Sequence, residues 1–372
     1  MKRRLITRRL VFRRFASTLA GLLALAGLGL FAGPADAASA VLGKDGTLYE
    51  VFEASYGQII AGASASDAQL PVLGLRTTPS AGVPAVEVVG GTVNDLVKLG
   101  ESLEFDDTTQ TVFVVYTRLQ GFFLDVHVAM RRSGAWTEDR LLPNPGLYVS
   151  MNPQLLVTRQ TYTDADDTGQ PVTKSRTILS IVWWEESDTS QARYAPVFIE
   201  DGSLRLDDVT VWNLNELSGS AGPTDNSGLP MSSYVHPGLQ RDAGTNGGVL
   251  VSFANLATRT QQVIHVSFPD NLLNLVPPDG LTPTQRTSFA RGNTPIGKAF
   301  AMTQLPTQMD LSFETQVGTV ISPAGVPTFY WSSDAGLSYL QGGSSTILTI
   351  PFRPDFPVDR AIAVVKDMSE KQ

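Results

Sequence analysis

The sequence predicts an all-β protein made of several similar antiparallel sheets, with one short helix at its C-terminal end. Strand-like runs rich in Val, Ile, Thr and aromatic residues alternate with turns of Gly, Pro, Asn, Asp and Ser. Long helical patterns are missing between residues 38 and 357, and one strand pattern recurs about every 69 residues. The 372 residues are ample for a large hydrophobic core.

Aromatic residues at the ends of five strand-like runs mark the repeat. Consecutive aromatics lie 64, 68, 69 and 78 residues apart, and a second run and a turn follow four of them. The five are Phe52, Tyr116, Trp184, Phe253 and Trp331. His127 and His265 lie in second runs 138 residues apart, so we expect them to occupy the same position in two units.

Five units of about 67 residues account for residues 38–372. A small antiparallel sheet has apolar faces and unpaired edges, and copies arranged around an axis bury the faces and protect the edges. The sequence therefore favours a five-bladed β-propeller over residues 38–356, with a helical tail at 357–372. A pair of β-sandwiches is the alternative. Long loops are expected at 161–174, 218–230 and 277–298.

Residues 1–37 have the pattern of a cleaved signal peptide. Basic residues precede an apolar stretch from Phe15 to Phe31, and Ala35-Asp36-Ala37 predicts cleavage after Ala37. Arg8-Arg9 also fits a twin-arginine signal, so this route and general secretion both remain open. Either route predicts a periplasmic or extracellular protein with no membrane span after cleavage; an uncleaved anchor is the alternative.

Composition excludes several classes of function. The chain has no cysteine, which rules out disulfides, thiolate nucleophiles and cysteine-ligated metal sites. Without residues 1–37, which hold seven basic residues and one acidic residue, the remaining 335 residues carry a formal charge of −14. Because such a surface repels phosphodiester backbones, we expect no nucleic acid partner.

The segment from Ser332 to Tyr339 follows a strand-like run and has the spacing of an Asp-box, S-x-D-x-G-x-[ST]-aromatic. We expect Asp334 to accept turn N–H groups, Gly336 to adopt a positive φ, and Tyr339 to pack beneath the hairpin, with Ser338 completing the pattern. The chain thus resembles the sialidase-like (BNR-repeat) β-propellers, although only this unit carries a full box. The resemblance implies that the box is a structural element, remote from any catalytic centre.

That resemblance also implies an arginine triad, a tyrosine nucleophile with its glutamate partner, and an acidic aspartate. The family's Arg-Ile-Pro element is missing near the N-terminus, and Arg353-Pro354 lies near the opposite end, so no catalytic residue is assigned. We interpret His127, His236 and His265 as structural rather than metal-binding. P-loop, H-E-x-x-H and G-x-S-x-G motifs are absent, so we expect no organic cofactor.

Asp164, Asp166 and Thr168, followed by Gly169, resemble the first half of a calcium loop. The position of the bidentate glutamate is taken by Ser175, which favours a solvated hairpin tip over a calcium site.

Two groups of residues are candidate ligand contacts. Trp183 and Trp184 are adjacent, so on a strand one faces the core and the other is available to stack on a sugar or peptide. Arg286 and Arg291 lie in the long loop at 277–298 and would attract an anionic ligand. Solvated loop charge is the alternative for the arginines.

The C-terminal tail changes period. Asp359 is suited to cap a helix in which Ile362, Val365 and Met368 recur at intervals of three. We expect this apolar stripe to cap the ring of sheets; docking of an envelope protein is the alternative.

Together these features predict an exported binding or scaffold module for a glycan, a peptide or an envelope protein. The alternative is a glycoside hydrolase acting on extracellular glycans. A convergence of carboxylates and arginines at the mouth of the central channel would favour the hydrolase, whereas small or apolar channel residues would exclude it.

Overall fold

The computed structural model describes residues 39–90, 98–120, 123–141, 149–186, 191–200, 202–204, 206, 209–214, 217, 234–242, 244–255, 258–273, 275–276, 283–306, 317–353 and 358–370. The predicted signal peptide and the predicted loop at 218–230 lie outside these residues, so both remain predictions.

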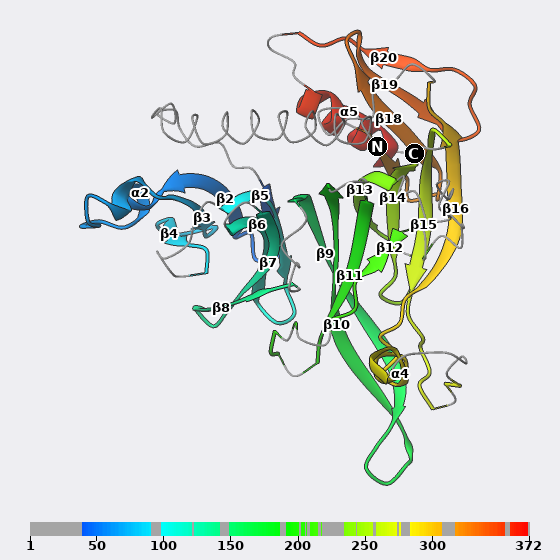
Figure 1. Cartoon of the computed structure of the whole chain (residues 1–372), viewed down its shortest axis with the longest axis horizontal. Coiled ribbons are helices and arrows are strands. Elements are labelled where there is room, and N and C mark those ends of the chain that lie inside the picture. Colours follow the sequence, from blue (N-terminus) through cyan, green and yellow to red (C-terminus); the bar gives the residue numbers. More distant parts are fainter. Residues whose placement is uncertain are drawn as a thin grey trace, which may run out of the picture.

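The described strands form five antiparallel units of four strands each, which we call sheets 1 to 5 (Figure 1). Sheet 1 contains β1 (Ser39–Leu42), β2 (Leu48–Ser55), β3 (Pro71–Thr78) and β4 (Ala85–Val88). Sheet 2 contains β5 (Lys98–Asp106), β6 (Thr111–Gln120), β7 (Phe123–Arg132) and β8 (Ala135–Arg140). Sheet 3 contains β9 (Val149–Ala165), β10 (Pro171–Glu186), β11 (Gln191–Ile199) and β12 (Trp212–Asn213). Sheet 4 contains β13 (Tyr234–Arg241), β14 (Val249–Asn255), β15 (Thr260–Ser267) and β16 (Ile296–Gln304). Sheet 5 contains β17 (Val317–Ile321), β18 (Pro327–Ser333), β19 (Gly336–Gln341) and β20 (Leu348–Ile350).

Helices are few in the described part of the chain. They are α2 (Tyr56–Ile59), the 3-10 turn η1 (Asp67–Gln69), α4 (Pro283–Ala290) and α5 (Val358–Glu370). None of these described helices has the length and apolar character needed to cross a bilayer.

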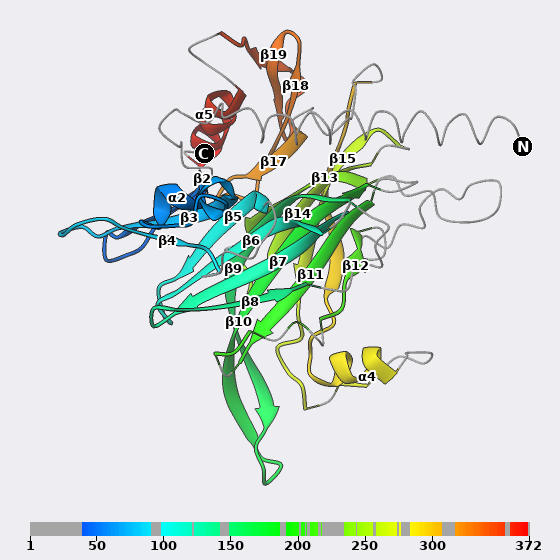
Figure 2. The ribbon, with the colours of Figure 1, turned by 60° about the vertical axis from the view of Figure 1, so that its left-hand side comes forward.

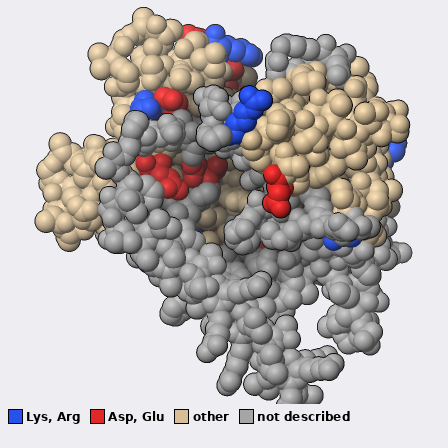
Figure 3. Space-filling view, turned by 90° about the horizontal axis from the view of Figure 1, so that it is seen from above, with Lys and Arg blue, Asp and Glu red and all other residues tan. Residues whose placement is uncertain are grey.

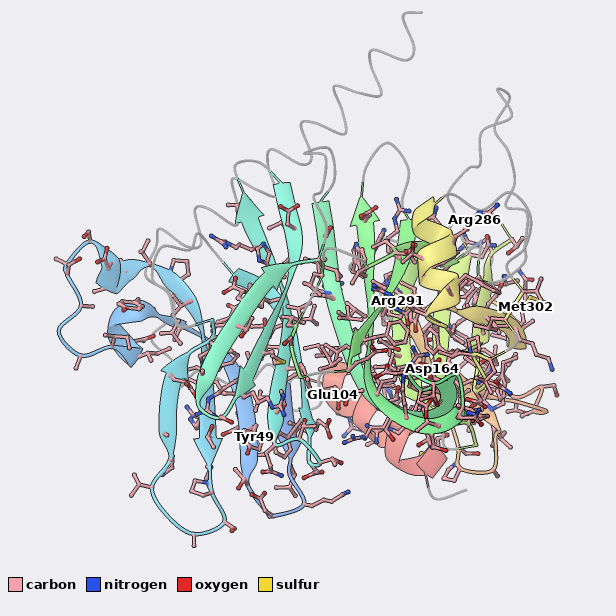
Figure 4. The ribbon with its side chains drawn as sticks, turned by 90° about the horizontal axis from the view of Figure 1, so that it is seen from below. Tyr49, Glu104, Asp164, Arg286, Arg291 and Met302 are labelled. Carbon is pink, nitrogen blue, oxygen red and sulfur yellow. The ribbon has the colours of Figure 1, made fainter. Side chains whose placement is uncertain are left out.

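The sheets follow one another around a common centre, with the first strand of each sheet innermost. β1 contacts β5, β5 contacts β9, β9 contacts β13, and β13 contacts β17. Seen from below Figure 1, the sheets succeed one another around the middle of the molecule in chain order (Figure 4). Sheets 2 and 3 are also joined by one parallel pair, between Leu124 and Val149.

The core lies between successive sheets. On β10, Leu179 and Ile181 pack in a cluster with sheet 2, while Ile178 and Val182 pack in a cluster with sheet 4. A sheet in a two-layer sandwich buries one face only, whereas sheet 3 buries both. These observations confirm the five-bladed β-propeller and show that the β-sandwich alternative is wrong.

The structure confirms that the five aromatic residues mark equivalent strands. Each of the five aromatics lies on the second strand of its sheet, namely β2, β6, β10, β14 and β18. The period is therefore that of the four-stranded sheet, because one aromatic recurs at the same strand of each copy.

The predicted equivalence of the two histidines is wrong. Both lie on the third strand of their sheets, but His127 pairs with Tyr116, whereas His265 pairs with Leu250, three residues before Phe253. A three-residue shift turns a side chain to the opposite face of a strand, so the two imidazoles have different surroundings. His265 Nε2 lies 3.2 Å from Asp242 Oδ2.

The first predicted long loop is the end of a two-stranded ribbon formed by β9 and β10, which extends beyond the other sheets (Figure 2). The predicted loop at 277–298 contains α4, which lies beside this ribbon (Figure 1).

Arg176 on β10 fastens the α4 segment to the ribbon. Its side chain is fully buried between the rings of Tyr162 and Phe198, at 4.7 and 4.3 Å. Nε and Nη2 donate to Gln160 Oε1 at 2.9 and 2.7 Å. The other acceptors belong to the residues directly after α4. Nη2 donates to Gly292 O at 2.9 Å, and Nη1 donates to Arg291 O at 3.1 Å and to Asn293 Oδ1 at 2.7 Å. All five guanidinium N–H groups are therefore satisfied by neutral acceptors.

The C-terminal helix α5 packs against β17, β18 and β19, on the face of sheet 5 that is turned away from sheet 4. The predicted helix is present, but its buried stripe differs from the prediction. Ala361, Val365 and Ser369, at intervals of four, are buried, whereas Met368 is 40% exposed. The helix also begins at Val358, before the proposed cap at Asp359.

Candidate functional site

The face of sheet 2 that is turned toward sheet 1 carries a row of polar side chains. Glu101 on β5 pairs with Tyr116 on β6, and Tyr116 pairs with His127 on β7. Directly paired residues of antiparallel strands point to the same side of the sheet, so the three side chains lie in one row. The rings of Tyr116 and His127 stack with centroids 5.8 Å apart.

A group of charged side chains lies beside this row. Glu138 Oε1 on β8 lies 3.7 Å from Arg118 Nη1 and 3.4 Å from His127 Nδ1. Asp125, the strand partner of Arg118, is 3% exposed, and His127 is 4% exposed. Buried charges are costly unless they are paired, and Arg118 and Glu138 pair across the outer strands of the sheet.

Glu53 on β2 brings a second carboxyl group toward Glu101. Burial, and then the negative charge of Glu53, raise the pKa of Glu101 from its usual 4.5 to about 7. Burial also raises the pKa of Glu53. Yet Glu53 is exposed and Glu101 is only half-buried. A side chain that water reaches but that protein atoms surround lies in a concave surface. Figure 3, seen from above Figure 1, shows acidic side chains gathered in a hollow of that face.

A third carboxyl group lies on the opposite face of β5. Glu104 pairs with Phe113 and points toward sheet 3, as does Ser102, whose Oγ accepts a hydrogen bond from the Leu155 amide of β9. Burial raises the pKa of Glu104 to about 7, although Arg241 lowers it in part. Figure 4 shows Glu104 near the middle of the ring. The innermost strand of sheet 2 therefore presents a carboxyl group to each of its two neighbours.

The raised pKa values of Glu101 and Glu104 predict how stability depends on pH. Between about pH 4.5 and 7 the folded chain keeps these two protons while the unfolded chain loses them, so the free energy of unfolding falls as pH rises through this window. After allowance for solvent screening we expect about 1–2 kcal/mol per site. Urea unfolding at pH 4.5 and 7.5 measures the fall, which should shrink in the Glu101→Gln and Glu104→Gln variants. An unchanged fall in both variants would contradict the assignment.

Both tryptophans are buried, at 3% exposure each, so the predicted core position holds for both and neither is available to stack on a ligand. Trp183 packs in the core between sheets 2 and 3, and its Nε1 donates to Glu185 Oε1 at 3.3 Å. Trp184 packs between sheets 3, 4 and 5 and meets the ring of His236 edge-on at 4.8 Å. The sheets bury both faces of β10, which the sequence did not reveal.

Arg286 lies on α4 and Arg291 directly after it (Figure 4). Both side chains are exposed. Trp183 and Trp184 lie near the end of β10, whereas α4 lies beside the opposite part of the ribbon (Figure 1). The structure therefore does not bring the arginines and tryptophans into one site.

The predicted calcium ligands are engaged by the chain's own donors. Asp164 Oδ2 accepts from Lys174 Nζ at 2.7 Å. Asp166 Oδ1 accepts from the Thr168 amide and hydroxyl and from the Gln170 amide, at 2.7–2.9 Å. These are the contacts of a hairpin tip closed by an aspartate, and they hold the pKa of both aspartates below the usual range. The described residues include no group of three His, Asp or Glu side chains placed to hold a metal ion.

The Asp-box segment forms the hairpin between β18 and β19. Gly336 has φ +138°, as predicted, and a Cβ there would lie 2.2 Å from the Ile350 carbonyl oxygen. Ser338 is buried and Tyr339 packs in the cluster with α5. The hydrogen bond described across this turn is donated by Ser333 Oγ to Gly336 O. The hydrogen bonds described for this turn do not include the predicted ones to Asp334.

Glu53, Glu101 and Glu104 belong to no motif that stands out in the sequence. Two of these glutamates could have been noticed because they interrupt a strand-like run. Glu101 and Glu104 lie among the apolar residues Leu99, Leu103 and Phe105. A charged residue in such a run also fits the solvated face of an outer strand, so the signal becomes specific only once β5 is known to be innermost.

No protein-family model and no curated protein matches this sequence. Among solved structures, the chain is similar to an endo-arabinase from Bacteroides thetaiotaomicron VPI-5482, with 9% identity, a TM-score of 0.32, and coverage of 85% of this chain and 93% of that one. It is also similar to a GH43_12 protein retrieved from a capybara gut metagenome, with 9% identity, a TM-score of 0.24, and coverage of 84% and 67%.

Proposed function

We propose that this chain is a glycoside hydrolase whose two carboxyl groups are Glu101 and Glu53. One observation carries the proposal: β2 of sheet 1 and β5 of sheet 2 contact each other and bring these two carboxyl groups together where water reaches both. The sequence left the hydrolase as the alternative to a binding or scaffold role. A convergence of carboxylates and arginines was expected to favour it, and Arg118 lies two residues from Tyr116, the strand partner of Glu101.

The environment of the pair fits the division of roles that glycoside hydrolysis needs. Glu101, with a pKa of about 7, keeps its proton in mildly acidic solution and is suited to donate it to the departing glycosidic oxygen. Glu53 is more exposed, and its carboxylate would face the positive charge that develops on the sugar ring. Glu101 differs from the similarly protonated Glu104 in having a second carboxyl group, Glu53, beside it, and such a pair is what hydrolysis requires.

The neighbouring residues would act as positioning residues. Tyr116 and His127 form the stacked wall beside Glu101, and Glu138 supplies a fixed negative charge paired with Arg118. These groups hold Glu101 on one face of β5 and keep its surroundings rigid, as a proton donor requires.

A finer placement among the sialidase-like (BNR-repeat) propellers is also a proposal. Its support is the hairpin from Ser332 to Tyr339, with the positive φ of Gly336. This hairpin lies in sheet 5 and concerns architecture rather than the reacting groups.

The test is release of reducing ends from a panel of neutral and acidic polysaccharides by the purified full chain, between pH 5 and 8. We expect release from at least one glycan, fastest below the pKa of Glu101. Binding to a glycan without release of reducing ends from any substrate would overturn the proposal and return the chain to the scaffold role.

A further inference from the structure

A cavity lies between sheets 2 and 3, at the end of β5 and β6 opposite Glu101. Its volume is about 260 Å³. Glu101 pairs with Tyr116 near one end of β5 and β6, whereas the hairpin that joins these strands forms one wall of this cavity at their other end. Strands β7, β9, β10 and β11 supply the remaining walls.

The lining is basic in an otherwise acidic protein. Three arginines, Arg132, Arg159 and Arg176, line it against one glutamate, Glu200, while the whole chain has a formal charge of −8. Like charges gathered around a cavity repel one another, so their convergence favours an anion between them.

The three arginines have different tasks. All five N–H groups of Arg176 are already used, so it contributes charge but no free donor. Arg159 is 40% exposed and Arg132 is exposed. Arg132 Nη1 donates to the Gly202 carbonyl at 3.2 Å, which fixes the guanidinium and leaves further N–H groups for a ligand.

Asp106 organises the floor and offsets part of its positive charge. The side chain is 5% exposed and lies 3.6 Å from Arg159 Nη1. Its oxygens accept from the Thr108 amide and from the hydroxyls of Thr109 and Thr177, at 2.9–3.2 Å. The carboxylate thus lies behind the wall, where it orients Arg159 and the threonines whose side chains line the cavity.

An apolar wall completes the cavity. Phe113, Met130 and Ile199 line it together with the arginines. The volume is slightly below the range of about 300–1,000 Å³ that is usual for drug-sized ligands, so the cavity suits one compact molecule rather than a length of polymer.

We propose that this cavity binds a small molecule, such as a single acidic sugar, through a carboxylate, sulfate or phosphate group held by Arg132 and Arg159. The guanidinium groups would take the oxyanion in fork-like hydrogen bonds, and the apolar wall would cover the body of the ligand. The site is separate from Glu101 and Glu53, so binding here stands whether or not the chain hydrolyses glycans.

Calorimetric titration of the full chain with inorganic sulfate, glucuronate, glucose 6-phosphate and glucose, at low ionic strength, tests the proposal. We expect at least one oxyanion probe to bind on the order of tenfold or more tightly than glucose, and Arg159→Gln and Arg132→Gln each to weaken it by about tenfold. The ranking of the three anions identifies the group that the site prefers.

Arg131→Gln is the matched control. Arg131 is the neighbour of Arg132 on β7, but it points to the opposite face and pairs with Glu87. We expect this variant to bind as the original chain does, and thermal unfolding of all three variants checks their folding. Equal binding of glucose, absence of binding by all three anions, or an equal loss in Arg131→Gln would each overturn the proposal.

Discussion

Replacing Glu101 by Gln is expected to lower kcat on the glycan substrate by about 10²–10⁴-fold, because the amide N–H groups are too weakly acidic to protonate the departing oxygen. The substitution keeps the shape of the side chain and removes a carboxyl group whose pKa is raised, so the variant should fold at least as stably as the original chain at pH 7. Initial rates of reducing-end release measure the loss.

Glu104→Gln is the matched control for this substitution. Glu104 lies on the same strand and has a similarly raised pKa, but it faces sheet 3 rather than sheet 1. We expect its activity to stay within about twofold of the original chain, since it does not touch the hollow. If Glu104→Gln removes activity and Glu101→Gln does not, the proton donor belongs to the other face of β5.

The pH dependence of the rate provides an independent readout. Glu101 acts in its protonated form, so kcat/KM should fall as pH rises through about 7, with the acidic limb set by protonation of Glu53. A rate that keeps rising above pH 8 would show that Glu101 is not the acid.

Replacing Arg176 by Met is expected to lower the free energy of unfolding by about 3–5 kcal/mol. Methionine still fits between Tyr162 and Phe198, so the lost stability comes from the hydrogen bonds of the guanidinium group. The substitution leaves Gln160 Oε1 and the carbonyls of Arg291 and Gly292 without their donors. Urea unfolding measures the loss, and hydrogen exchange should show the amides of α4 opening first.

Lys174→Met is the control for Arg176→Met. Lys174 lies two residues away on β10, and its ion pair with Asp164 is exposed, so its loss should cost less than about 1 kcal/mol. Arg176→Lys should recover only part of the stability, because an ammonium group cannot reproduce the planar fork. Equal unfolding midpoints for Arg176→Met and Lys174→Met would show that the buried guanidinium adds nothing to stability.

Local patterns were sufficient for the architecture. The alternation of apolar residues, the turn residues between them and the spacing from Phe52 to Trp331 predicted five similar sheets, and the tail from residue 357 predicted a helix. These features depend on residues close in the chain, where backbone sterics and side-chain direction act directly.

Contacts between different sheets could not be read in the same way. The proximity of Glu53 and Glu101, the burial of both Trp183 and Trp184, and the mismatch between His127 and His265 all depend on register and on which face meets which neighbour. The repeat determines the number of sheets but not the register of each strand. A one-residue slip or a bulge turns a side chain to the opposite face of its sheet. Such a bulge separates Leu99 from Glu101 at the start of β5, so the packing of whole sheets, rather than any local motif, decided where the carboxyl groups of the hollow point.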